Sequence, residues 1–168
     1  VGRSDMAEAI RRGDDIHSRI GSRIAGLPYD EFVRRRKAGD PDCVNVRQTS
    51  KPVNFGYMGG MGPAKMAAAV WKQARIRISE AQARMYRGAW LREWSEASAY
   101  FEHVNGLIGG RNVTTSIRLF VSGRDRGNVT FTEACNGFFS AIANDGAGDA
   151  VFAVSREMYA VPSSPLFG

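Results

Sequence analysis

The 168-residue chain has few of the residues that build metal sites and disulfide frameworks. It contains two cysteines, Cys43 and Cys135, and two histidines, His17 and His103. The cysteines form no C-x-x-C pair, which argues against a zinc site and a secreted disulfide scaffold and favours a reducing cytoplasm. Neither histidine has a cysteine or carboxylate at metal-ligand spacing, so we expect no metal site built on histidine.

Other absences exclude further classes of protein. No apolar run reaches the roughly 18 residues that indicate a membrane span, and no signal-peptide pattern is present. The sequence has no GxSxG elbow and no Ser/His/Asp order of a hydrolase, and its glycine-rich segment 56–62 lacks the GK[ST] ending of a P-loop. It also has no internal repeat and no low-complexity linker.

Basic residues outnumber acidic ones by 23 to 17, which gives a formal net charge of +6. Only Lys37, Lys51, Lys65 and Lys72 are lysine, so the other 19 basic residues are arginine. Arginine's planar fork matches phosphate oxygens in pairs, so this balance permits a polyanionic partner such as nucleic acid or a nucleotide. A GC-rich genome that encodes arginine readily explains the same composition.

Most of the chain shows helical periodicity. We expect helices behind Asp14 and Asp15, from Pro28 to residue 38, from about Asp42 to the glycines after residue 58, and from Pro63 to about residue 73. Ser79 and Gln82 have the spacing of a capping box, which begins a long helix ending before residues 109–110. Six residues form an apolar stripe on that helix, which we interpret as core: Tyr86, Trp90, Trp94, Phe101, Val104 and Ile108.

The residue composition changes after residue 112, and the new pattern predicts a β-hairpin and one more helix. Residues 113–121 and 129–131 have β-type composition and flank turn residues 122–127. A final helix is expected from about Thr132 to Tyr159. The predicted fold class is therefore mainly α with a small antiparallel β-hairpin (α+β).

The stretch RQTSKPVNFGYMGGMG, residues 47–62, places Arg47, Lys51 and Phe55 at intervals of four residues. On one helix these positions drift by only about 40°, so the side chains point the same way. The two cations repel each other unless an anion lies between them, and a triphosphate would satisfy both while Phe55 lies against a base or sugar. The alternative is a solvated basic face with Phe55 buried beside it.

Several segments together resemble family A DNA polymerases, which include the bacterial repair polymerase and many phage replicative enzymes. The stretch above resembles their motif B, R-x3-K-x3-F-G followed by Tyr-Gly, on the fingers helix that faces the incoming nucleotide. Residues 13–19, GDDIHSR, are similar to the D-x-H segment that precedes motif B. Gly123-Arg124 and residues 133–146, EACNGFFSAIANDG, resemble the later G-R turn and the N-x3-Q-G-x-A-A-D helix. These four segments occur in the same order as in the family. The sequence pattern of residues 54–62 is similar to that of a phage or prophage branch.

The resemblance implies a nucleotide site on the first half of the chain. His17, Arg47 and Lys51 would contact the triphosphate of a dNTP, and Phe55 would stack on its base and sugar. Arg47 and Lys51 would also be the catalytic candidates, because they would stabilise the charge of the transferring phosphoryl group.

The resemblance also implies contacts to DNA. Asn136 would lie near the minor groove of the primer–template, and Ser140 takes the place of the family's minor-groove Gln with a shorter side chain. Arg124 would contact the DNA backbone. Gly59 replaces the motif B Tyr, which leaves Tyr57, two positions earlier, as the aromatic candidate for a DNA contact.

Pro52 interrupts the expected motif B helix immediately after Lys51. It removes one backbone donor and destabilises a regular helix interior by roughly 3 kcal/mol. The helix therefore either begins close to Lys51 or kinks there. If it begins there, Arg47 approaches from a preceding turn.

Family A polymerases transfer nucleotides with two Mg²⁺ ions held by carboxylate motifs. Those motifs precede the D-x-H segment and follow the N-x3-Q helix, and we expect both to lie outside this chain. Asp14 and Asp15 are interpreted as helix-start residues, so we expect no metal ligand here and no catalysis by the segment alone.

The sequence therefore predicts a fingers-like helical region at residues 1–111 and part of a palm at residues 112–168. The intact parent would be a DNA-directed DNA polymerase, a nucleotidyltransferase that extends a primer 3′-hydroxyl from dNTPs, with primer–template DNA as partner and no membrane role. The hairpin and last helix would lack palm strands to pack on, so we expect an exposed apolar surface and self-association. The alternative function is a non-catalytic basic nucleic-acid-binding module or a decayed polymerase relic.

Overall fold

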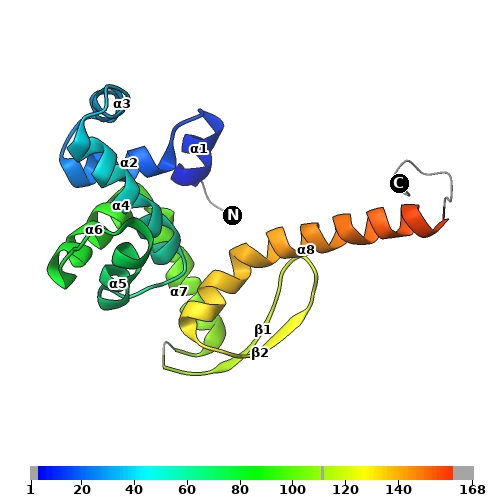
Figure 1. The fold of residues 1–168 in the computed structure, drawn as a ribbon. Coiled ribbons are helices and arrows are strands. Elements are labelled where there is room, and N and C mark those ends of the chain that lie inside the picture. Colours follow the sequence, from blue (N-terminus) through cyan, green and yellow to red (C-terminus); the bar gives the residue numbers. More distant parts are fainter. Residues whose placement is uncertain (1–3, 111, 161–168) are drawn as a thin grey trace. The chain divides into compact units, whose positions relative to one another are not determined.

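A computed structural model describes residues 4–110 and 112–160 of the chain. Over these residues the fold is mainly helical, with eight helices and one small two-stranded antiparallel sheet (Figure 1). The chain divides into two compact units, Val1–Gly106 and Leu107–Gly168. Residues 1–3, 111 and 161–168, at the edges of the two predicted regions, lie outside the described residues.

The first unit is a set of helices connected by short turns. Its helices are α1 (Asp5–Arg11), α2 (Ile16–Ala25), α3 (Tyr29–Lys37), α4 (Pro41–Met58), α5 (Pro63–Ala74), α6 (Glu80–Glu93) and most of α7 (Glu96–Ile108). α4 packs against α2, α3, α5 and α6, so it lies at the centre of the unit. The helices predicted from residue 16 to residue 74 are confirmed, whereas α1, which Ser4 caps through Ala7 N, was not predicted.

Helix α4 is continuous through Pro52. It begins at Pro41, so Arg47, Lys51 and Phe55 lie on one helix, and the possibility that a helix begins near Lys51 is wrong. The hydroxyls of two residues just before the proline, Thr49 and Ser50, donate to carbonyls four residues earlier, at 3.0 and 2.8 Å. Tertiary packing on several sides outweighs the local cost of the proline.

The long aromatic helix predicted after residue 79 is instead two helices. The capping box of Ser79 and Gln82 is present, but the chain leaves helical geometry at Trp94, where φ is −115° and ψ is 75°. The expected core role is nonetheless confirmed for five of the six stripe residues. Trp90, Trp94, Phe101, Val104 and Ile108 are all at most 5% exposed.

A buried carboxylate ties α2 to α6. The side chain of Glu93, at the end of α6, is 2% exposed and accepts hydrogen bonds from Arg19 Nε at 2.6 Å and Arg23 Nε at 2.5 Å. Two guanidinium partners compensate the desolvation of the carboxylate. The α2–α6 contact is therefore held by charge as well as by apolar packing.

Helices α2 and α3 approach each other at Gly21. A Cβ added there would lie 2.5 Å from Cζ of Phe32, which is fully buried. We expect Gly21→Ala to lower the free energy of unfolding by about 1–3 kcal/mol, because the ring has no room to move. Gly88→Ala in α6 is the control: its Cβ meets only Arg92 Nη1, at 3.4 Å, and the better helix propensity predicts a gain of up to about 1 kcal/mol. Urea unfolding of both variants measures the difference, and equal stabilities would contradict the close contact.

The second unit contains a hairpin and the helix that follows it. Strands β1 (Thr115–Arg118) and β2 (Asp125–Val129) pair antiparallel, and α8 (Phe131–Ala160) packs on β2. Register changes between the pairs Thr115–Val129 and Ile117–Arg126, where Asn128 has a φ of 54°. The hairpin and the last helix are confirmed, although residues 125–127, predicted as turn, belong to β2.

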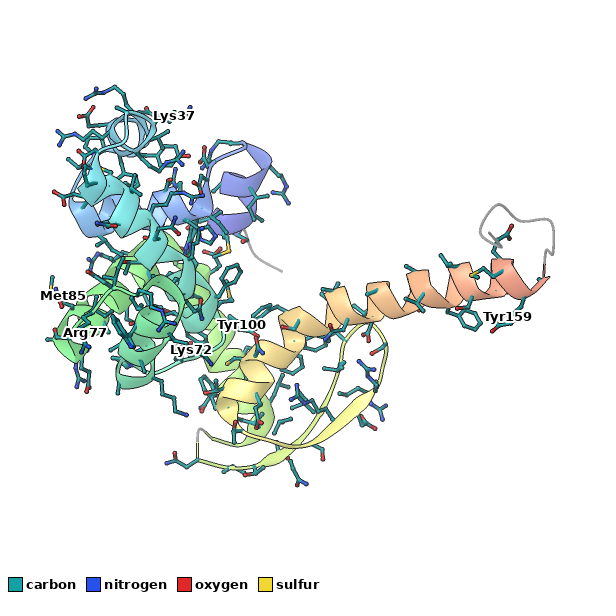
Figure 2. The ribbon with its side chains drawn as sticks, viewed as in Figure 1. Lys37, Lys72, Arg77, Met85, Tyr100 and Tyr159 are labelled. Carbon is teal, nitrogen blue, oxygen red and sulfur yellow. The ribbon has the colours of Figure 1, made fainter. Side chains whose placement is uncertain are left out.

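The hairpin covers only the first part of α8. The rings of Phe120 and Phe138 stack with centroids 4.7 Å apart, and Ala134 and Cys135 are fully buried. Five apolar side chains farther along α8 are 46–87% exposed: Ile142, Val151, Phe152, Val154 and Tyr159. Tyr159 lies near the C-terminal end of the helix (Figure 2). The expected self-association stays a prediction.

Candidate functional site

The site begins at the N-terminus of α2, where Asp15 is the N-cap. Its carboxylate accepts from His17 N at 3.1 Å and from Ser18 Oγ at 2.8 Å. The Tyr29 hydroxyl accepts from the backbone N–H of Asp15 at 2.9 Å. The interpretation of Asp15 as a helix-start residue is confirmed, and the cap places His17 in the first turn of α2.

Asp15 also binds Arg47 of α4. Arg47 Nε donates to Asp15 Oδ2 at 2.6 Å, and both side chains are about one quarter exposed. Desolvation raises the pKa of Asp15, but hydrogen bonds from Arg47 and Ser18, together with the charge of Arg47, lower it to about 2. The terminal guanidinium nitrogens of Arg47 form no hydrogen bond or ion pair to a residue in the described part of the chain, so they can bind an anion.

The Asp15–Arg47 pair predicts a pH dependence of stability. The folded pKa of about 2 lies below the ordinary value of 3.8, so the contribution is present above pH 4 and is lost as pH falls towards 2. It amounts to about 2 kcal/mol. Asp15→Asn keeps a good N-cap but removes the charge, so we expect it to be less stable than the original chain by about that amount at pH 7 and nearly equal to it near pH 2. Urea unfolding at the two pH values measures this, and a difference that persists near pH 2 would contradict the ion pair.

Asn54 is the buried centre of the site. Its Nδ2 donates to Ile16 O and His17 Nδ1, both at 3.0 Å, and its Oδ1 accepts from Trp90 Nε1 at 3.0 Å and Trp94 Nε1 at 3.1 Å. The side chain is 3% exposed. Indole nitrogens only donate and a carbonyl only accepts, so these partners allow a single orientation of the amide. Asn54 therefore joins α2, α4 and the end of α6.

This amide orientation determines the tautomer of His17. Because Asn54 donates to Nδ1, that nitrogen accepts, and the neutral ring carries its proton on Nε2. The pKa of His17 is lowered by desolvation and by the charges of Arg47 and Lys51, against an opposing effect of Asp15. His17 is thus held as a neutral imidazole with one N–H donor left for a ligand.

Phe55 and Lys51 complete the outer face of α4. Phe55 is 62% exposed, and its ring meets the His17 ring edge-on with centroids 5.5 Å apart. The alternative that buries Phe55 is therefore wrong. Lys51 is half-buried and forms no ion pair with any residue that the structure describes. The structure thus gathers all four predicted nucleotide contacts on α2 and α4: His17, Arg47, Lys51 and Phe55.

The predicted DNA contacts fall in two different places. Tyr57 is 1% exposed and its hydroxyl donates to Ala83 O at 2.5 Å, so it lies in the core and offers no surface to DNA. Desolvation raises the pKa of this phenol to about 12. Tyr57 faces inward because it lies two residues from Phe55 on the helix, on the opposite side.

The other three DNA candidates come together in the second unit. Arg124, Asn136 and Ser140 line one cavity of about 360 Å³, together with Arg126 and other hairpin and α8 residues. Ser140 Oγ donates to Asn136 Oδ1 at 3.4 Å. Arg124 forms an ion pair with Asp145 at 2.8 Å, which holds the turn of the hairpin against α8. The cavity combines cationic and amide donors, which are among the groups that contact phosphate and sugar in protein–DNA complexes.

The described residues do not fit the magnesium that the resemblance implies. In residues 4–110 and 112–160, no group of three or more His, Cys, Asp or Glu side chains could hold a metal ion. Asp14 binds Arg12 and Arg19, and Asp15 binds Arg47. We therefore assign no chemical step to a metal on these residues.

Sequence patterns missed the residues that support this face. Asn54 lies within residues 47–62, where no sequence pattern distinguishes it, and the periodicity of Trp90 and Trp94 indicates only a core role. An asparagine adjacent to an exposed aromatic is a weak signal, because helical spacing predicts only that it lies on the buried side. The partners of Asn54 are 36–40 residues away along the chain in one direction and 37–38 in the other.

No family model matches the chain. No curated protein matches it either. Among the described helices, none is both long enough and apolar enough to cross a membrane.

Proposed function

We propose that this chain is the fingers region and part of the palm of a family A-type DNA polymerase, in which α2 and α4 bind the incoming dNTP. The observation that carries the proposal is the shared face of His17, Arg47, Lys51 and Phe55, with an exposed ring beside three nitrogen donors. The order of the four sequence landmarks supports the family. The parent reaction would be attack of a primer 3′-hydroxyl on the α-phosphate of a dNTP, with release of pyrophosphate.

The three nitrogen donors suit a triphosphate for different reasons. Lys51 supplies a charge with no ion-pair partner among the described residues, Asp15 orients Arg47, and His17 supplies a neutral N–H donor. A fixed neutral donor binds an anion without the repulsion that a third cation would add beside the other two. In the parent enzyme, Arg47 and Lys51 would stabilise the charge that grows on the leaving phosphates.

Phe55 supplies the apolar part of the proposed site. Its ring is 62% exposed and lies edge-on to the His17 ring, so it is accessible to a base or sugar beside the proposed phosphate contacts. Base and sugar would cover this ring while the phosphates extend towards α2. The cavity of Arg124, Asn136 and Ser140 would contact the primer–template in the palm.

Titration calorimetry with dATP and with inorganic tripolyphosphate tests the nucleotide site. We expect Lys51→Ala to weaken both ligands about 10- to 100-fold, because one charge-assisted contact is lost. Phe55→Ala should weaken dATP about tenfold, since stacking is lost, and leave tripolyphosphate unchanged. Lys37→Ala, an exposed lysine on α3 (Figure 2), is the control for lost charge.

The second candidate function predicts a different pattern. A basic nucleic-acid-binding module would bind duplex DNA with a steep salt dependence and would show no preference for dATP over tripolyphosphate. Residues 43–79, which include most of α4 and all of α5, contain no aspartate or glutamate, and this supports the alternative. Equal effects of Lys51→Ala and Lys37→Ala on every ligand would support it and contradict a dNTP site.

A further inference from the structure

The net positive charge of the chain is concentrated in one segment. Residues 43–79 contain six lysines and arginines and no aspartate or glutamate: Arg47, Lys51, Lys65, Lys72, Arg75 and Arg77. The other residues carry 17 basic and 17 acidic side chains, so this segment accounts for the whole net charge of +6. A polyanion is therefore attracted to α4, α5 and the connection that follows α5.

An exposed tryptophan lies among three of these cations at the end of α5. Trp71 is 40% exposed, and the guanidinium carbons of Arg77 and Arg75 lie 4.4 and 5.8 Å from its ring centroid. Lys72 is the next residue along α5 (Figure 2). We name Trp71, Lys72, Arg75 and Arg77 the Trp71 patch. A guanidinium stacked on an indole keeps its N–H groups free for an anion, so stacking orients these donors without consuming them.

Several surface arginines of the chain are neutralised by carboxylates, whereas, among the residues described, the cations of the Trp71 patch are not. Arg84 pairs with Glu80, and Arg118 pairs with Asp125. Lys72, Arg75 and Arg77 form no ion pair with any residue in the described ranges, and all three are exposed. Their charge is not neutralised by neighbouring carboxylates.

The backbone at Arg75 gives a second, independent observation. Arg75 is the C-cap of α5 with a φ of 59°, and its N–H donates to Trp71 O at 3.1 Å. Glycine is the usual residue in this left-handed conformation. Among the described residues, the only other non-glycine with positive φ is Asn128, a type that tolerates it. At this position arginine makes the fold less stable than glycine would, which indicates that the arginine side chain has a role of its own.

We propose that the Trp71 patch binds a single-stranded nucleic acid, with the three cations on successive phosphates and a base against the exposed part of the indole. Bases of a single strand are free to stack on an aromatic ring, whereas those of a duplex are already stacked on each other. A carboxylate-rich protein surface would match the charge but would leave the indole without a planar partner. The proposal does not depend on nucleotide binding by α2 and α4.

The Arg75→Gly variant separates binding from folding. We expect it to be at least as stable as the original chain in thermal unfolding, because glycine suits the left-handed C-cap. Its affinity for a fluorescein-labelled single-stranded DNA, measured by anisotropy, should fall about fivefold, and the slope of log K against log salt should decrease in magnitude by about 0.7. Unchanged affinity and slope would overturn the proposal. Lys37→Gln on α3 removes the same charge elsewhere, and an equal loss of affinity in that control would also overturn it.

Tryptophan fluorescence provides a direct readout of contact. Trp90 and Trp94 are at most 1% exposed, so quenching on addition of unlabelled single-stranded DNA reports on Trp71. We expect strong quenching by single-stranded DNA and weak quenching by inorganic polyphosphate or by duplex of the same sequence. If polyglutamate displaces the labelled DNA in the anisotropy assay as strongly as unlabelled single-stranded DNA does, the partner is an acidic protein. If polyphosphate quenches Trp71 as strongly as single-stranded DNA does, binding is by charge alone. Either result rejects the proposal.

Discussion

An Asn54→Leu variant is expected to lose about 3–5 kcal/mol of its free energy of unfolding. Leucine has a similar size, but it would leave the indole N–H groups of Trp90 and Trp94 without partners in the core. Each buried polar group without a partner destabilises by about 1–3 kcal/mol. Urea unfolding followed by fluorescence measures the loss, since both tryptophans change environment on unfolding.

Asn45→Leu is the matched control for that change. Asn45 is an exposed residue of the same helix, and its side chain forms no hydrogen bond within the described residues. We expect its stability to change by no more than about 0.5 kcal/mol. If the two variants lose the same stability, the four hydrogen bonds of Asn54 do not hold the three helices together.

Asn54→Asp is expected to reverse the protonation of His17. A carboxylate there can still accept from both indoles, but it can only accept from His17 Nδ1, so that nitrogen must take a proton. The added negative charge would raise the pKa of His17, opposite to the present lowering by burial and by Arg47 and Lys51. Above that pKa the neutral ring would present a bare Nε2, and triphosphate binding should weaken about tenfold, as for loss of one hydrogen bond to a charged group.

Nitrogen-15 NMR of the imidazole side chains measures this change directly. The chain has only two histidines, and His103 is exposed on α7, so it serves as an internal reference. In the original chain at pH 8, His17 should show an unprotonated Nδ1 and a protonated Nε2, and the variant should show the reverse. A protonated Nδ1 in the original chain would contradict the hydrogen bond from Asn54.

Sequence patterns predicted most of the helices because their signals are local. The capping box of Ser79 and the N-cap at Asp15 act within three residues of themselves, and the apolar periods of α2 and α6 show one buried face. The four-residue spacing of Arg47, Lys51 and Phe55 likewise specified a shared face. Local rules were sufficient wherever the stabilising partner lies on the same helix.

The errors occur where distant partners decide the local structure. Pro52 destabilises a helix by itself, yet α4 continues through it because other helices surround it. The aromatic period from Tyr86 to Ile108 fits one helix, but the chain breaks at Trp94, whose indole reaches Asn54. The role of Asn54 was invisible for the same reason, since every partner of its amide lies more than 35 residues away in sequence.

The ion pairs of Glu93 and the hydrogen bonds of Asn54 together form a triangulated frame. Glu93 links α6 to α2, while Asn54 links α4 to α2, to Trp90 of α6 and to Trp94, the residue that follows α6. Because the three helices are linked in pairs, none of them can slide past another without breaking one of these interactions. A displacement of the surface that carries His17 and Phe55 is therefore expected to move α2, α4 and α6 together.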